Sequence, residues 1–241
     1  MLTLAGNFID GAWRPAVSGR LLGRIGLLDA ALEFLPAASG QADVVRSLAA
    51  AERAAADWRR LPWAARLQLL SLAARAVGCA RRTLALAETW AVGGPLRRHL
   101  ATSIPAMQRT LTEPADLGLV GGGVAPTPGA HAGPGPLRAL LSDATAGAEL
   151  LRRLAPPLAA GHSLVLAVLI TGPLVPAARH MLLSQLLGSA LPPGVCNVLF
   201  GAPAELGSAI VDAGSGRLLQ LGCCSVLRGR ARGRRAVAER G

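Results

Sequence analysis

The chain contains no lysine and no tyrosine, so each of its 25 strongly basic side chains is an arginine. The absence of lysine excludes Schiff-base catalysis, which needs a lysine amine as nucleophile. It also excludes a Walker A phosphate loop, so the glycine triplet at residues 121–123 is not one. Aromatic residues make up only 3% of the chain, which leaves few platforms on which nucleic-acid bases stack.

Cysteine and acidic residues are also scarce. Four cysteines among 241 residues cannot staple a fold with disulfides, and Cys79, Cys196, Cys223 and Cys224 follow no zinc-ligand spacing. We therefore expect reduced thiols, a cytoplasmic location and no metal site. Only 14 acidic residues oppose the arginines, which gives a formal net charge of +11.

A long uninterrupted apolar run is missing, although 51% of the residues are hydrophobic. Residues 154–178 carry no Asp, Glu or Arg, but prolines and glycines divide this stretch. Its longest apolar run covers residues 164–170, whereas about 20 residues are needed to span a bilayer. A run of this length is typical of a buried parallel strand, so we expect no membrane span.

Hydrophobic periodicity predicts helices in the first half of the chain and alternating strands and helices in the second. A short strand is predicted at residues 7–13, followed by helices at 43–58, with Asp43 as N-cap, 63–80, 82–90 and 95–111. Strands at 137–141, 164–170 and 195–200 then alternate with helices at 145–154, 176–189 and 204–211. This alternation over short connections predicts an α/β fold built on a parallel sheet.

Two segments differ from this pattern in composition. Residues 113–136 are rich in glycine and proline and are predicted to form an irregular loop. Residues 213–241 hold seven of the arginines and one acid, Glu239, so they carry more than half of the net charge. They are predicted to be a basic, unstructured tail that binds anions non-specifically. We therefore predict a domain over residues 1–212 and a tail over residues 213–241.

Four stretches of the chain together resemble the aldehyde dehydrogenase superfamily. They are residues 8–13, residues 49–73, residues 156–166, and residues 191–198 followed by Gly201 and residues 205–207, of which the last is the most specific. The resemblance covers residues 7–212 and implies the cofactor domain of that family, an incomplete Rossmann-like parallel sheet with a helical N-terminal layer. It also implies NAD or NADP as cofactor and a protein partner, or a homo- or hetero-oligomer of dehydrogenase-like domains.

The pattern of the family is changed where it binds cofactor and substrate. The family carries a ribose-binding lysine on the strand at 164–170 and a glutamate three residues later. Here these positions are Ala167 and Ile170, which offer no polar side chain. Ala144 stands where an asparagine helps to hold the oxyanion. Gly201 is left as a candidate for close approach of a cofactor, with a plain turn glycine as the alternative.

The resemblance predicts an inactive, truncated member of the family that acts through protein contacts. It is most similar to family 16, whose tandem domains include some without catalytic residues. We assign no catalytic residue, because the family's cysteine nucleophile and glutamate base would follow residue 212. Our hypothesis for the change in composition after residue 212 is an alternative splice or a change of reading frame. Two alternatives stay open: the cofactor-binding part of an active NAD(P)-dependent aldehyde dehydrogenase, and a basic nucleic-acid-associated module.

Three further features allow a chemical and a structural interpretation. Cys196 is interpreted as a core residue rather than a nucleophile, because no base or cation can be placed beside it. His162 is interpreted as a turn-stabilising residue rather than a catalytic base. Cys223 and Cys224 are interpreted as thiols of the tail rather than metal ligands.

Overall fold

The computed structural model describes residues 2–27, 31–113, 136–213 and 218–221. The eight strands of these ranges form one sheet in the order β3-β4-β1-β7-β6-β5-β8, with β2 paired to β1. The strands are β1 (Leu2–Ile9), β2 (Ala12–Arg14), β3 (Ile25–Leu27), β4 (Leu32–Pro36), β5 (Leu137–Ser142), β6 (Leu164–Leu169), β7 (Cys196–Gly201) and β8 (Leu218–Leu221).

The sheet is mixed, so the prediction of a parallel sheet is correct for its second half and for the pair of β1 and β4, and wrong for the other pairs. Strands β7, β6, β5 and β8 run parallel, whereas β1 is antiparallel to β7 and to β2, and β3 is antiparallel to β4. The strand predicted at residues 7–13 is a hairpin. Asp10 and Gly11 both adopt a positive φ, of 57° and 74°, which is the backbone of a tight two-residue hairpin turn.

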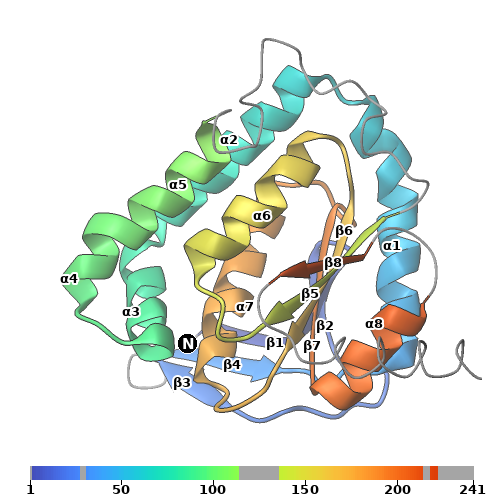
Figure 1. The fold of residues 1–241 in the computed structure, drawn as a ribbon, viewed down its shortest axis with the longest axis horizontal. Coiled ribbons are helices and arrows are strands. Elements are labelled where there is room, and N and C mark those ends of the chain that lie inside the picture. The colour runs from blue at the N-terminus through green and yellow to red at the C-terminus, as the bar shows by residue number, and fades with distance from the viewer. Residues whose placement is uncertain (1, 28–30, 114–135, 214–217, 222–241) are drawn as a thin grey trace, which may run out of the picture.

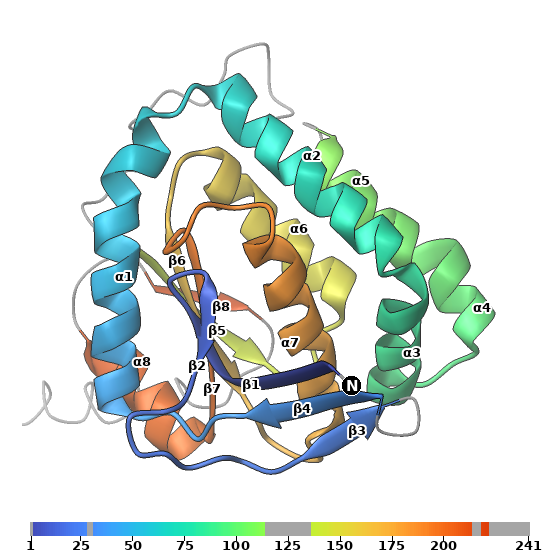
Figure 2. The same cartoon turned by 180° about the vertical axis from the view of Figure 1, so that it is seen from behind.

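Helices cover both faces of the sheet (Figures 1 and 2). In the first half of the chain, α1 (Gln41–Arg60) packs mainly on the smaller core. The N-terminal layer on the other face holds α2 (Trp63–Cys79), α3 (Arg81–Val92), α4 (Leu96–Arg98), the π-helical turn η1 (His99–Ser103) and α5 (Ile104–Thr112). The second half adds α6 (Gly147–Ala159), α7 (Val175–Gly188), the π-helical turn η2 (Pro203–Gly207) and α8 (Ser208–Asp212). In the described part of the chain, we find no helix whose length and apolar character would let it cross a membrane.

Alternate residues of each parallel strand enter two separate cores. In β6, Leu164, Leu166 and Val168 pack into the larger cluster with α6 and α7, behind which α2, α3 and α5 lie. Val165, Ala167 and Leu169 face the smaller cluster with α1 and α8. Both faces of β6 are buried, which explains its continuous apolar run. The strand predicted at 164–170 is confirmed.

Asp43 is not the N-cap of α1 as predicted, because the N-cap lies three residues earlier. Gly40 is its N-cap, and Asp43 lies at the third helical position. The Asp43 carboxylate accepts hydrogen bonds from the backbone N–H of Gly40 (3.1 Å) and of Val17 (2.9 Å). Asp43 therefore caps the helix from inside its first turn and fastens the preceding loop to it.

Helix α6 continues through Pro156 and Pro157, so the predicted end before Pro156 is wrong. Each proline removes one backbone donor. The end of the helix is held from outside instead. The indole N–H of Trp58 donates to the Leu158 carbonyl (3.0 Å), and Nε of Arg66 donates to the Ala159 carbonyl (2.8 Å). These bonds from α1 and α2 stabilise a last turn that helix propensity alone disfavours.

The segment predicted as a tail contributes one strand to the sheet. Residues Leu218–Leu221, inside the segment predicted as an unstructured tail, form β8 and pair in parallel with β5. Their apolar sequence and the open edge of β5 account for this pairing. The basic run at 222–241, with Cys223 and Cys224, and most of the loop at 113–136 lie outside the described residues.

Candidate functional site

The candidate site is the edge of the sheet where β5, β6 and β7 end. Ligands of open parallel sheets bind beyond these carboxyl ends, so the cofactor expected from the resemblance would lie here. Backbone hydrogen bonds connect the strand ends: Asp143 N–H donates to the Leu169 carbonyl (3.1 Å), and Ile170 N–H donates to the Gly201 carbonyl (2.9 Å). The residues that follow the strands therefore have fixed positions.

Ala167 lies inside the smaller core. It is fully buried, and its register partners are Leu140 on β5 and Leu199 on β7, which belong to the same cluster beneath α1 and α8. Its methyl group therefore completes an apolar layer. It offers no hydrogen bond to a ribose, which a family member would bind with a lysine amine from this position.

Ile170 and Gly201 also serve packing. Ile170 is half-buried against the larger core. A Cβ on Gly201 would lie 2.7 Å from Cβ of Leu206 and 3.2 Å from the Ser39 carbonyl oxygen. Gly201 is therefore required by the close approach of η2 and of the loop before α1, which accounts for the glycine without a ligand.

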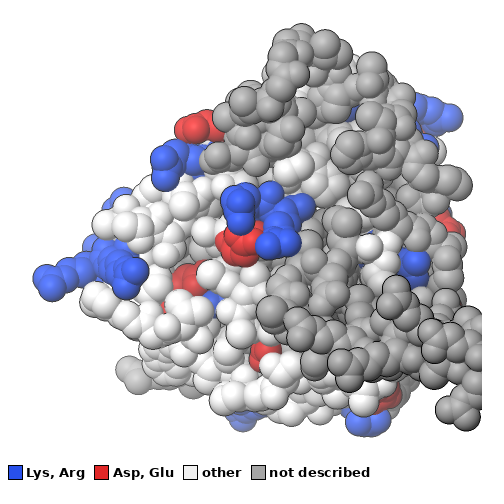
Figure 3. Space-filling view, viewed as in Figure 1, with Lys and Arg blue, Asp and Glu red and all other residues white. Residues whose placement is uncertain are grey.

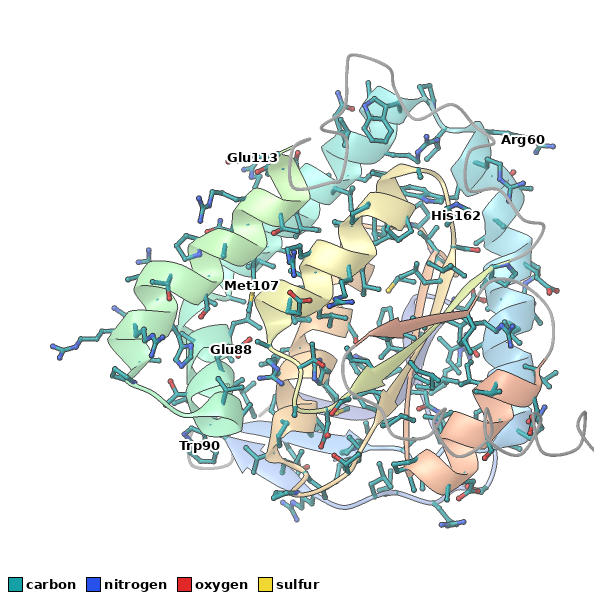
Figure 4. All side chains as sticks on the ribbon, viewed as in Figure 1. Arg60, Glu88, Trp90, Met107, Glu113 and His162 are labelled. Carbon is teal, nitrogen blue, oxygen red and sulfur yellow. The ribbon has the colours of Figure 1, made fainter. Side chains whose placement is uncertain are left out.

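A buried ion pair lies beside the ends of β5 and β6. Nη1 of Arg179 on α7 donates to a Glu88 carboxylate oxygen on α3 (3.0 Å), and both side chains are almost fully buried. The other carboxylate oxygen of Glu88 accepts the Gly147 N–H at the start of α6 (2.8 Å). Glu88 thus joins three helices, and Figure 4 shows it on the inward side of α3.

The same arginine fixes the loop that follows β5. Nη2 of Arg179 donates to the Asp143 carbonyl (2.8 Å), and Nε2 of His180 lies 3.0 Å from that oxygen. The Thr171 hydroxyl donates to the Asp143 carboxylate (2.9 Å), which joins the loops after β5 and β6. Asp143 is itself only 3% exposed. These polar groups are therefore committed to each other and hold Ala144 in place.

Burial controls ionisation in this network. Burial, together with the neighbouring Arg179 charge, lowers the pKa of His180 to about 3 although the Asp143 carbonyl acts in the opposite direction, so the imidazole is neutral at physiological pH. Since a carbonyl oxygen can only accept, the proton of this neutral ring is on Nε2. Burial also lowers the pKa of Arg179, while Glu88 acts in the opposite direction. A neutral, enclosed His180 lacks the access that a catalytic base needs.

Sequence reasoning missed Glu88, Arg179, His180 and Asp143. One signal was present: Arg179 and His180 interrupt the apolar helix predicted at 176–189. A charge that interrupts such a helix is buried and needs a partner. That partner, Glu88, lies 91 residues away in sequence, and only the packing of α3 on α7 reveals it.

Cys196 and His162 lie outside this network. Cys196 is buried in the larger core, and burial raises the pKa of its thiol to about 12, so it carries no thiolate at neutral pH. The His162 backbone N–H donates to the Pro157 carbonyl (2.9 Å) and closes the turn before β6. The role predicted for the His162 side chain stays a prediction.

Comparisons with known proteins identify the fold. Residues 35–127 match the model of the aldehyde dehydrogenase family. An aldehyde dehydrogenase from Deinococcus radiodurans is 32% identical over 214 residues, and one from Rhodospirillum rubrum is 30% identical over 214 residues. By sequence and by fold, the chain is similar to members of the aldehyde dehydrogenase family.

The solved structures of this family extend the match to three dimensions. Indole-3-acetaldehyde dehydrogenase from P. syringae, in a structure that contains NAD+, is 26% identical with a TM-score of 0.65 over 85% of this chain. The match spans 42% of that protein. The match to the D. radiodurans enzyme includes 86% of this chain but only 41% of the enzyme, so the chain spans about two fifths of the length of its curated relatives. The predicted α/β cofactor-domain fold of the aldehyde dehydrogenase family is therefore confirmed.

The described residues do not fit the ribose of the family's nicotinamide cofactor. The ribose hydroxyls would need a hydrogen-bond donor and an acceptor at positions 167 and 170, but the side chains of Ala167 and Ile170 are hydrocarbon. Ala167 is also enclosed in the core. The nearby polar side chains Asp143 and Thr171 are hydrogen-bonded to each other across the loops after β5 and β6. We derive no chemical step through a nicotinamide cofactor in this chain.

Proposed function

We propose that the chain is a non-catalytic domain of the aldehyde dehydrogenase family that acts through contacts with protein partners, such as other dehydrogenase-like domains. The proposal includes the narrower resemblance to family 16. It treats the chain as a cofactor domain, predicted over residues 1–212 and extended by β8, that has lost its cofactor and carries a basic tail after that strand. The competing proposal is a cofactor-binding part of an active NAD(P)-dependent aldehyde dehydrogenase.

The observation that carries this proposal is the burial of Ala167. Its methyl group fills the layer between β6 and the helices α1 and α8. A lysine at this point would bring an amine into a region lined by Leu140, Leu199 and Leu206, where a charge without a partner costs several kcal/mol. The apolar packing around Ala167 is thus adapted to the absence of the ribose-binding amine.

The loop after β5 supports the same proposal. Ala144 lacks the side-chain amide with which the family holds an oxyanion, and its neighbour Asp143 is anchored by Arg179 and Thr171. The anchored loop cannot bring another polar side chain into that place without breaking the buried network. The edge that serves chemistry in the family is therefore used for packing in this chain.

The test is a calorimetric titration of the purified chain with NAD+ and with NADP+. We expect no binding up to millimolar cofactor, because the ribose contacts are missing. The P. syringae indole-3-acetaldehyde dehydrogenase, whose structure contains NAD+, is the positive control. A dissociation constant near 1 μM for this chain, about −8 kcal/mol, would support the competing proposal and overturn ours.

A further inference from the structure

The helices α3 and α4 meet at an outer corner of the N-terminal layer where apolar and basic side chains are exposed. Trp90 is 50% exposed, Val92 47% and Leu96 40%. Arg97 and Arg98 follow directly and are exposed as well. We call these five residues the α3–α4 corner. Figure 4 shows Trp90 at the lower end of α3, pointing away from the ribbon, and Figure 3 shows basic side chains where α4 lies.

Hydrogen bonds hold the corner in one conformation. Gly93 has φ 78° and its N–H donates to the Thr89 carbonyl (2.9 Å), while Arg98 N–H donates to the Pro95 carbonyl (2.9 Å). The buried His99 ring lies 2.8 Å from the Gly93 carbonyl oxygen through Nε2 and 3.1 Å from the Ser103 hydroxyl through Nδ1. A surface held in this way loses little conformational entropy when it binds.

The positive charge of the corner is not neutralised within the described residues. Neither Arg97 nor Arg98 forms an ion pair there. The only acid on α3 is Glu88, which is buried and paired with Arg179. By contrast, Arg152 and Arg153 on α6 both pair with Glu149. The corner therefore offers charge to a partner, and the α6 arginines do not.

We infer that the α3–α4 corner is a docking surface for an acidic, apolar segment of a partner protein. Trp and Arg are the residues most enriched among those that dominate protein interfaces. A carboxylate-bearing segment would pair with Arg97 and Arg98 while its apolar side chains cover Trp90, Val92 and Leu96. This inference rests on the proposed function, because it names the surface and the partner chemistry of a domain that acts through protein contacts.

The number of arginines favours a protein over a membrane or a nucleic acid. Anionic membranes are recognised by clusters of about four to eight basic residues, and a nucleic-acid surface needs a longer row of phosphate contacts. The corner has two arginines. Arg81 and Arg82 lie at the opposite end of α3, about 12 Å along the helix from Trp90 at 1.5 Å per residue. The basic row is therefore too short for either polyanion.

The experiment uses the full chain and a fluorescein-labelled synthetic helical peptide with glutamate on one face and leucine on the other. A second peptide carries glutamine in place of each glutamate. We expect the acidic peptide to bind more tightly in fluorescence anisotropy. Removing the corner charges with R97Q/R98Q should weaken it about tenfold, which is roughly 1.4 kcal/mol, and W90A should weaken it by a similar factor.

The matched control is R152Q/R153Q, which removes two helical arginines that are already paired, and we expect less than about a twofold change there. Equal weakening by the two double variants would overturn the inference, because net charge alone would then explain binding. Unchanged binding in W90A and R97Q/R98Q would also overturn it. Circular dichroism melting shows whether each variant remains folded.

Two competing probes assign the surface if the peptide fails. Vesicles of phosphatidylcholine with 30% phosphatidylserine, or an oligothymidylate, that bind wild type but not R97Q/R98Q would overturn the inference in favour of a membrane or a nucleic acid. The cofactor titration is independent of these assays. Peptide failure without NAD+ binding overturns only the docking surface, whereas NAD+ binding overturns the proposed function.

Discussion

The two ends of the parallel strands are fastened by different chemistry. At the amino end, neutral amides connect the hairpin to β6 and β7: Oδ1 of Asn197 accepts the Asp10 N–H (3.0 Å), and its Nδ2 donates to the carbonyls of Leu164 (3.1 Å) and Gly194 (2.7 Å). At the carboxyl end, the fastening is the ionised pair of Glu88 and Arg179.

The same two ends divide the family resemblance into residues that serve folding and positions that serve chemistry in the family. The most specific motif, residues 191–198, lies at the amino end and is explained by folding. A Cβ on Gly194 would lie 2.7 Å from the Ala50 carbonyl oxygen, and Asn197 makes three hydrogen bonds. Of the changed positions, Ala144 and Ile170 follow the carboxyl ends of β5 and β6, and Ala167 lies within β6. A motif can therefore identify the fold while it carries no information about catalysis.

The largest expected effect breaks the carboxyl end. Glu88→Ala leaves the Arg179 charge buried without its partner and removes the acceptor of the Gly147 N–H. We expect a loss of about 3–5 kcal/mol in the free energy of unfolding, measured by urea denaturation. Glu149→Ala removes an acid from the exposed ion pairs on α6 and should cost less than about 1 kcal/mol.

The double variant E88A/R179M tests the cause of that loss. If an unpaired charge is responsible, replacing the arginine with an apolar side chain should recover a large part of the stability. Additive losses in the double variant would contradict this account. They would show that packing around Glu88, rather than its charge, holds α3 against α7.

A smaller effect is expected at the amino end. Asn197→Ala removes three hydrogen bonds made by a fully buried side chain, each of which contributes about 1 kcal/mol, so we expect a loss of about 3 kcal/mol. Ser189→Ala removes one exposed hydrogen bond and should change stability by less than about 0.5 kcal/mol. If both changes have equal effects in urea denaturation, Asn197 does not fasten the hairpin.

Local patterns predicted most elements of the fold, and long-range packing decided the rest. The apolar run of β6 and the helix pair α1–α2 follow from periodicity. The passage of α6 through Pro156 depends on Trp58 and Arg66, which are far away in sequence. Strand β8 depends on the edge that β5 offers. Such contacts leave no signal in a local window of sequence.

The site could be predicted only in part, for the same reason. The resemblance pointed to Ala167, Ile170 and Gly201, and the structure shows what each contacts. Ala167 packs in the smaller core, Ile170 packs against the larger core, and Gly201 leaves room for η2. The ion pair that occupies the neighbouring space joins residues 91 positions apart. Its acid, Glu88, has the sequence context of an ordinary amphipathic helix and could not be distinguished from a surface residue.

The smallest effect concerns pH and should belong to the carboxyl end alone. The pKa of His180 is about 3 in the folded chain, against about 6.5 when unfolded. Between these values the unfolded chain binds a proton that the folded chain does not. Stability is therefore full above about pH 6.5 and falls as pH decreases, by about 1.4 kcal/mol per pH unit once the unfolded imidazole is protonated.

The measurement is urea denaturation of wild type, H180Q and N197A at several pH values between 7.5 and 5. We expect H180Q to have a shallower loss of stability toward pH 5, whatever its stability at pH 7.5. N197A should keep the wild-type slope, because its hydrogen bonds involve only amides at the other end of the strands. Parallel slopes for wild type and H180Q would mean that the imidazole gains its proton in the folded state. The polar network around His180 would then be open to water, and the carboxyl edge of the sheet could not be described as an edge used only for packing.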